Sequence, residues 1–451
     1  MASHLCVPVD GLKADTKTPD LLNASLVCKS FNELTTRRLW RVVRQALHYR
    51  RDDPKAMPSV PLPKSKLRHT KDLQFLIGFP GAATCRHNLT DESQEQLDVR
   101  LSETVNTILD AFEDGQIEEF SWHVEDCIPQ CAIGSQGILS TRHPGLQLLA
   151  MSSDTSCQGP DPADLAKGLD AFRQLRTISW MLPSAANVRH LALLFKNNAE
   201  HLRDVELITS PGDIVYGMST GLRAEDDELS SEEGLREFMI GQVLCAGVPA
   251  PLEAPVFPAI RKLCLDEVGV DERLGLALNF ETLEVLVLHG CPGWGLAVES
   301  AARHGGKIRL REFELYAMYS VAVTDFERLC GFITAFSGLR SFCASMDGSL
   351  RSAPMWECLA GHHAATLKRF VHCQQRIPET DDWPNLMECL WPAAASSNEA
   401  RIDSDMAPLQ LGPQGSMLKE CDLEFLGFEA TQSHMVNMIL GRNSRTRSPS
   451  S

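Results

Sequence analysis

The stretch LEVLVLHGC (residues 283–291) decides the fold. Its apolar residues Leu283, Leu286 and Leu288 are separated first by two residues and then by one. The alternation over 286–288 is typical of a β-strand that buries one face. Cys291 follows at a place where a side chain can satisfy backbone groups as the chain leaves the strand. The stretch therefore predicts a strand and the turn that ends it.

The same pattern recurs along the 451-residue chain. Neighbouring copies begin 23–29 residues apart, except for two long steps of 58 and 51 residues that are close to two periods. A period in this range is typical of leucine-rich repeats, in which each unit buries its apolar face against its neighbours. The other copies begin at Ile117, Leu146, Leu175, Leu202, Ile260, Leu310, Leu339, Leu367 and, most weakly, Leu418.

The segments between the copies have helical periodicity. Residues 187–202 and 324–339 carry apolar side chains three and four positions apart. We therefore expect an α/β fold over residues 67–430, a leucine-rich-repeat-like solenoid of strand–turn–helix units with a parallel sheet. The 58-residue step contains an acidic and proline-rich insert, 209–259. A doubly wound βαβ domain also alternates strands and helices, but the fixed period favours the solenoid.

A solenoid of this kind binds partners with its concave strand face. Residues between the buried apolar positions point outward because strand side chains alternate. The outward residues are mixed in charge with an acidic middle, which predicts a protein partner with a basic or mixed patch. As the target-binding face we select Glu206, Asp266, His289, Glu314, Tyr316 and Arg369.

The N-terminal region, 18–50, predicts a small helical hairpin after a variable arm at 1–17 and before a proline-rich linker at 51–66. Thr18-Pro19-Asp20 is a strong helix start. Thr35 or Thr36 can cap a second helix that carries Leu39, Val42 and Val43 on one side. Two short helices bury too little area to fold alone, so the hairpin needs a partner surface.

The segments DLLNASLVCKSFNEL (20–34) and RRLWRVV (37–43) resemble the second and third helices of an F-box. The family's first helix is degenerate or missing here, where LCVPVDGL (5–12) is its poor counterpart. The resemblance, together with the fungal-type pairing of an F-box with irregular repeats, implies docking on the adaptor subunit of a cullin-type ubiquitin ligase. By resemblance the docking residues are Leu21, Leu22, Leu26, Val27, Phe31, Leu34, Leu39 and Trp40.

The charge distribution bears on partner and compartment. The net charge is −16, while residues 1–70 are basic. For residues 431–451 we expect a short helix and a disordered basic tail. The body between them is therefore strongly acidic. Nucleic-acid binding needs a basic face, so we expect no nucleic-acid partner. No leader pattern and no long apolar run is present, so we expect no membrane association and an intracellular location, cytoplasmic or nuclear.

Motifs for chemistry are weak, and we expect no enzyme activity and no cofactor. GMSTG (217–221) fits a nucleophile elbow around Ser219, but an acidic loop follows instead of an apolar helix, so a serine hydrolase is a remote alternative. His123, Cys127 and Cys131 have a spacing that could bind zinc, but Pro129 breaks that helix. The fifteen cysteines form no disulfide framework, and we expect free thiols. Three interpretations stay open: a ubiquitin-ligase receptor, an interaction scaffold without a ligase link, and the hydrolase.

Overall fold

The computed structural model describes residues 29–47, 64–77, 92–124, 127–153, 162–181, 183, 185–209, 232–304, 306–317, 321–347, 353–375 and 421–428. Within these ranges one twelve-stranded sheet follows the order of the sequence, and all neighbouring strands are parallel. The strands are β1 (Val42–Leu47), β2 (Asp72–Ile77), β3 (Glu119–His123), β4 (Leu148–Ser152), β5 (Thr177–Met181), β6 (Asp204–Ile208), β7 (Lys262–Asp266), β8 (Val285–His289), β9 (Glu312–Tyr316), β10 (Ser341–Asp347), β11 (Arg369–Gln375) and β12 (Phe425–Phe428).

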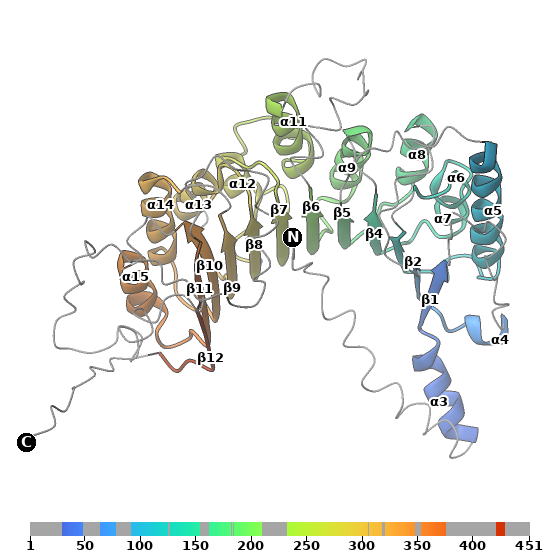
Figure 1. The fold of residues 1–451 in the computed structure, drawn as a ribbon, viewed down its shortest axis with the longest axis horizontal. Helices are drawn as coiled ribbons and strands as arrows, with labels where there is room; N and C mark the ends of the chain where they lie inside the picture. Colours follow the sequence, from blue (N-terminus) through green and yellow to red (C-terminus); the bar gives the residue numbers. More distant parts are fainter. Residues whose placement is uncertain are drawn as a thin grey trace, which may run out of the picture.

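The sheet curves into an arch, and helices line its outer side (Figure 1). From β3 to β11 no described helix covers the inner side, and α3 projects from the β1 end. A doubly wound sheet would reverse its strand order at a switch point, and this sheet does not. The helical elements are α3 (Lys29–Leu39), α4 (Lys64–Leu67), α5 (Glu92–Leu109), α6 (Gln130–Ile133), α7 (Ile138–Arg142), α8 (Pro162–Leu169), α9 (Ala185–Asn198), α11 (Glu232–Phe238), the π-helix η4 (Met239–Leu244), α12 (Glu272–Ala277), α13 (Trp294–His304), α14 (Val323–Thr334) and α15 (Ala353–His363).

The apolar positions of the repeat form the core between the sheet and its helices. The first residue of each copy from Ile117 to Leu367 is at most 1% exposed. The two helices expected from periodicity are confirmed as α9 and α14. Cys291 is buried, and its thiol donates to the backbone oxygen of Leu265 at 3.4 Å, as expected for the turn after β8.

The last copy of the pattern is misplaced in the sequence-based prediction. Strand β12 begins at Phe425, which pairs with Arg369. This register puts Leu423, which packs against the core, opposite Leu367. The copy therefore begins at Leu423, five residues later than Leu418, because the correct register was hidden by several apolar residues close together.

The second helix of the N-terminal hairpin is absent, and that prediction is wrong. Val42 and Val43 lie in strand β1, which pairs with β2. Val43, Gln45 and Leu47 are buried while the residues between them are not, which is the period of two of a strand. β-branched residues also favour the extended backbone. The sheet therefore begins inside the region predicted as hairpin. The next described elements after β1 are α4 and β2.

The apolar repeat pattern did not predict strand β2, because the first position of this copy is polar. Thr70 is fully buried where the other copies have leucine or isoleucine. Its hydroxyl donates to the backbone oxygen of Trp40 at 2.7 Å, and its own carbonyl accepts from Gln116 at 3.0 Å. A buried hydroxyl with a partner costs little, so threonine can replace an apolar residue here.

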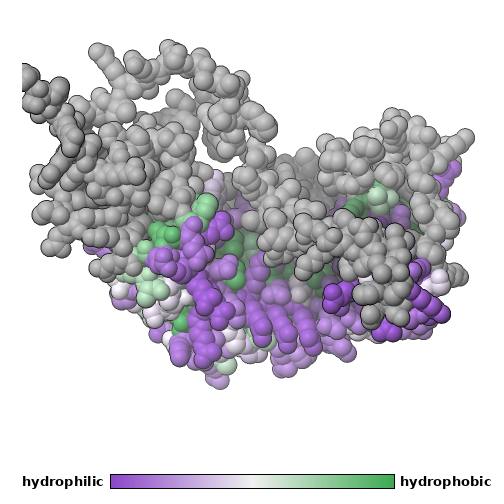
Figure 2. Space-filling view, turned by 90° about the horizontal axis from the view of Figure 1, so that it is seen from below, coloured by the Kyte–Doolittle hydropathy of each residue, from purple (hydrophilic) through white to green (hydrophobic). Residues whose placement is uncertain are grey.

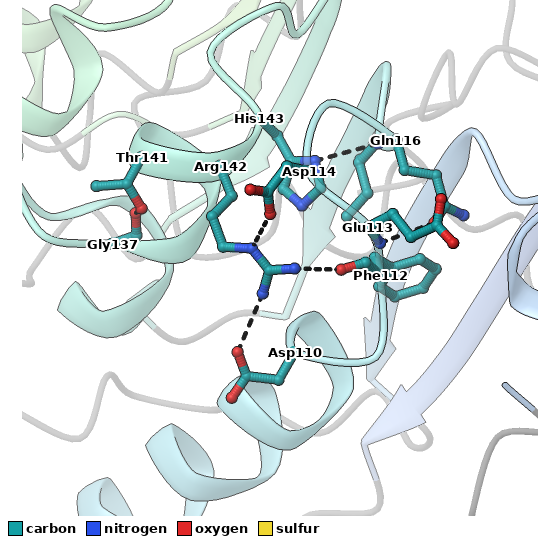
Figure 3. Close-up of polar contacts among 10 residues, drawn as sticks. Asp110, Phe112, Glu113, Asp114, Gln116, Gly137, Thr141, Arg142 and His143 are labelled. Atoms are coloured by element: carbon teal, nitrogen blue, oxygen red, sulfur yellow. Dashed lines mark hydrogen bonds and ion pairs between the residues drawn. The ribbon is translucent and has the colours of Figure 1, made fainter.

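Buried polar side chains tie the end of three repeats to their own beginning. His143, His363 and Asn198 each accept a hydrogen bond from the backbone N–H of the first-position residue of the same repeat. Burial lowers the pKa of His143 to about 4, so its ring is neutral and Nδ1 can accept from Ile117. Arg142 beside it binds Asp110, Asp114 and the carbonyl of Phe112, closing the turn before β3 (Figure 3).

The described part of the 209–259 insert contains a helical unit of the repeat. α11 and η4 lie between β6 and β7 in the chain. Four η4 side chains are buried, namely Met239, Ile240, Val243 and Leu244. These elements lie within the 58-residue step, and the strands on either side of it, β6 and β7, are adjacent in the sheet.

Candidate functional site

The inner face of the sheet carries three rows of outward residues, one residue per strand in each row. Strand pairing puts the middle row in register over β2 to β11. Serine, alanine, cysteine and valine make up most of it, and the two acidic positions are separated by an apolar pair. The row is Gln74, Ser121, Ala150, Ser179, Glu206, Cys264, Val287, Glu314, Cys343 and Val371.

A charged cluster lies at the middle of this face, formed by Asp266, His289 and Glu314 on three consecutive strands. His289 Nε2 is 3.0 Å from Glu314 Oε1, a hydrogen bond. His289 Nδ1 is 3.9 Å from Asp266 Oδ2, which is an ion-pair distance and too long for a hydrogen bond. The imidazole therefore bridges two carboxylates, and its side chain is only 16% exposed.

The cluster fixes its own charge state. Burial opposes a charged imidazole, but the contacts with Asp266 and Glu314 outweigh it and raise the pKa of His289 to about 9. The hydrogen bond from His289 lowers the pKa of Glu314 against the effect of burial, and the charges of His289 and Arg369 act in the same direction. At neutral pH His289 is therefore an imidazolium hydrogen-bonded to the Glu314 carboxylate.

The predicted binding residues fall into three groups. Asp266, His289, Glu314 and Tyr316 lie together, since Asp266, His289 and Tyr316 are register partners and the Tyr316 ring meets the imidazole edge-on at 6.1 Å. Glu206 lies apart and accepts a hydrogen bond from Ser179 at 2.9 Å. Arg369 lies towards the C-terminal end, with its guanidinium 5.4 Å from the centre of the exposed Phe425 ring. The face is thus one surface with three separate polar features.

A second polar cluster, at the β1 end of the face, was missed in the sequence analysis. Asp72 and Glu119 are register partners on β2 and β3. Burial, and next the charge of Glu119, raise the pKa of Asp72 to about 6. Gln74 donates to Asp72 Oδ2 at 2.8 Å and accepts from Arg44, whereas Asp72 Oδ1 is buried without a partner. The i, i+2 spacing of Asp72 and Gln74 marks one strand face and could have indicated this cluster.

The residues selected for adaptor docking are only partly described. Leu21, Leu22, Leu26 and Val27 lie outside the described residues. Phe31 and Leu34 belong to α3, but their side chains are not described. Leu39 ends α3, and Trp40 packs against the core of the repeat domain. Trp40 therefore contributes to the solenoid itself, in addition to any role in docking.

The motifs considered for chemistry have different outcomes. Ser219 lies outside the described residues. Cys127 is disulfide-bonded, so the expectation of free thiols is wrong at this position. Sequence spacing could not show this bond, because a disulfide depends on how close the folded backbones come.

Among the described residues, no group of three or more histidine, cysteine, aspartate or glutamate residues could hold a metal ion. None of the described helices combines the length and the apolar character needed to cross a membrane.

No protein-family model matches the chain, and no curated protein sequence matches it.

Proposed function

We propose that the chain is a non-catalytic receptor of a cullin-type ubiquitin ligase, built on a leucine-rich-repeat-like solenoid. The inner sheet face would bind a target protein, and the N-terminal helical segment would dock the small adaptor subunit. The observation that carries the proposal is the inner face, which no described helix covers from β3 to β11 and which holds a bridged charge cluster at its middle. Such faces are the binding surfaces of solenoid proteins.

The central cluster supports recognition of a protein with a basic or mixed patch. The side chains of Glu314 and Asp266 are 41% and 31% exposed, so both carboxylates can accept further hydrogen bonds from a partner. His289 holds them in a fixed geometry, which lowers the entropy lost on binding. Tyr316 adds an amphipathic ring beside them, a residue type enriched in protein interfaces.

The arrangement of α3 supports a docking role for the N-terminal segment. The helix projects away from the arch, and it passes into β1 within two residues (Figure 1). Backbone hydrogen bonds from Trp40 to Thr36 and from Arg41 to Arg38 close this junction. A subunit bound to this segment would therefore be held in a defined orientation to the target-binding face.

An interaction scaffold without a ligase link is the second candidate, and one observation favours it. Residues 40–43, which the resemblance assigns to the F-box, serve the solenoid: Trp40 packs on the core, and Val43 is buried in the sheet. In that case the N-terminal helix only caps the first strand. The two candidates differ in one property, which is affinity for the adaptor subunit.

Binding of the purified full chain to the purified adaptor subunit separates the two candidates. We expect capture by the wild type and loss of capture in Leu26→Asp, because a charge in an apolar docking seam is desolvated without a partner. The matched control is Val99→Asp, which adds the same charge at an exposed valine of α5. Absence of capture by the wild type would remove the ligase function and leave the scaffold. Equal capture by all three proteins would show that docking does not use Leu26.

Target binding is tested with a charge-reversal pair on the inner face. Glu206→Lys with Glu314→Lys should abolish the association with proteins that co-purify with the wild type, since like charges then face a basic patch. The control is Glu327→Lys with Glu357→Lys, an equal change at exposed positions of α14 and α15. Thermal unfolding of each variant shows whether the fold persists. Unchanged association in the inner-face variant would contradict the proposal.

A further inference from the structure

A second surface runs along the edge of the sheet where the strands begin. From β5 to β11, the residue directly before the strand is basic in six of the seven repeats. We call these residues the edge row: Arg176, Arg203, Arg261, Arg311, Arg340 and Lys368. The backbone holds the row in register, because the carbonyl of each residue accepts from the next strand, for example Arg203 O from Arg261 N at 2.7 Å and Arg340 O from Lys368 N at 2.8 Å.

The edge row is accessible and largely unneutralised. Its five arginines are exposed, and Lys368 is half-buried. Arg311 pairs with Glu284 at 3.4 Å, and Lys368 with Asp422 at 2.6 Å. The other four arginines have no ion pair with any described residue. Seen from below, a band of hydrophilic residues runs along the molecule (Figure 2).

This concentration of positive charge contrasts with the chain as a whole, whose net charge is −16. Between β5 and β11 the only acidic residue at the pre-strand position is Glu284. In the first strand position of the same repeats, Lys262 and Arg369 balance Asp204 and Glu312. A basic strip on an acidic body selects for an anionic partner at short range and repels large polyanions at long range.

We propose that the edge row binds an extended, carboxylate-rich segment of a partner protein. The proposal is independent of the ligase function and of the central cluster, which lies on the inner face near the strand ends. Adjacent strands are about 4.8 Å apart, so the row from β5 to β11 spans roughly 29 Å. An extended peptide covers that length with about nine residues. Guanidinium groups bind carboxylates with two parallel hydrogen bonds, which favours arginine over lysine in such a row.

The geometry favours carboxylates over phosphate and over nucleic acid. One cation per strand in a single line matches charge that is spread along a peptide, whereas a phosphate group is held best by several cations that converge on it. Single-stranded nucleic acid also needs aromatic side chains on which bases can stack. The described pre-strand and first-strand positions of β5 to β11 contain no aromatic residue.

Fluorescence anisotropy with a labelled decaglutamate peptide tests the proposal on the full chain at about 50 mM salt, where exposed ion pairs are weakly screened. The test variant combines Arg203→Glu, Arg261→Glu and Arg340→Glu. We expect its affinity to fall at least about tenfold. The control combines Arg189→Glu, Lys196→Glu and Arg303→Glu on the outer helices α9 and α13, with the same change in net charge. The control should lose less than about twofold.

Three results would overturn the proposal. The first is equal loss of affinity in the test and control variants, which would assign binding to net charge alone. The second is absence of peptide binding by the wild type. The third is tighter binding of a phosphorylated peptide or a single-stranded oligonucleotide of equal length, which would change the class of partner. Circular dichroism of each variant shows that the comparison is made between folded proteins.

Discussion

Two carboxyl groups on the same face of the sheet have pKa values that are shifted in opposite directions. Asp72, near the β1 end, has its pKa raised to about 6 by burial and then by Glu119 across the strand pair. Glu314, at the middle, has its pKa lowered by the hydrogen bond from His289. The backbone environment is the same parallel sheet in both places. Burial at Asp72 and the hydrogen bond from the neighbouring strand at Glu314 therefore give the two carboxyl groups opposite pKa shifts.

This difference separates a region suited to recognition from one that limits stability. The middle cluster presents the partly exposed side chains of Asp266 and Glu314, which a partner can contact. At the β1 end, Asp72 loses solvation, faces a like charge and leaves Oδ1 without a partner. A buried carboxylate in that position destabilises the folded state when ionised.

The largest expected effect is at the middle cluster. His289→Ala leaves Asp266 and Glu314 facing each other without a cation. We expect the free energy of unfolding at pH 6 to fall by about 2 kcal/mol. The increase in the pKa of His289 from 6.5 to about 9 corresponds to roughly 3 kcal/mol, and the solvent exposure of Glu314 reduces this value. Urea unfolding measures the change. The control His362→Ala removes an exposed histidine of α15. Equal effects of the two substitutions would contradict the bridge.

The opposite sign is expected at the β1 end. Asp72→Asn should raise the free energy of unfolding by about 1–2 kcal/mol at pH 7.5, because it removes a buried charge that faces Glu119. The amide can still accept from Gln74. The same urea experiment measures the gain. A loss of stability would show that the ionised carboxylate has a favourable partner.

The pH dependence should sharpen the comparison further. The folded-state pKa of His289 lies above its unfolded value, so its stabilisation is complete below about pH 6.5 and is lost as pH rises through about 9. The pKa of Asp72 is also raised, so its cost is complete above about pH 6 and disappears as pH falls towards about 4. Wild type and His289→Ala should therefore converge at high pH, and wild type and Asp72→Asn at low pH. Parallel curves would contradict both assignments.

The smallest effect is expected at Thr70, which ties β2 to the segment before β1. Thr70→Val keeps the shape and removes the hydroxyl that donates to Trp40 O. The loss should be about 1 kcal/mol, since the carbonyl of Trp40 is left without that donor. Thermal unfolding gives the change. A stability equal to the wild type would mean that water replaces the hydroxyl.

The repeat could be predicted from the sequence wherever leucine, isoleucine or an aromatic residue fills its three positions. Copies such as 283–288 and 310–315 are in the correct register because apolar spacing and burial agree. The first strands were missed because Thr70 occupies an apolar position, and because Val42 and Val43 fit a helix as well as a strand over so short a segment. Periodicity alone cannot separate the two in a short apolar run.

The candidate site was predictable as a set of strand positions but not as a set of contacts. Alternation placed Asp266, His289 and Glu314 on one face, since it depends only on the period of the strand. Their bridge depends on the register between β7, β8 and β9, which is fixed by strand pairing and not by the spacing within one strand. The same dependence hid the pair of Asp72 and Glu119, which lie 47 residues apart in the sequence.

Site-specific photo-crosslinking in cells tests the central claim that the inner sheet face binds the target. A photoreactive amino acid is placed at Glu206 or at Tyr316 on the inner face, and at Val323, an exposed valine of the outer helix α14, for comparison. The account predicts a common crosslinked protein from both inner positions and none from position 323, and that protein should lose its ubiquitin in a Leu26→Asp background. Crosslinks from position 323 alone would contradict the account.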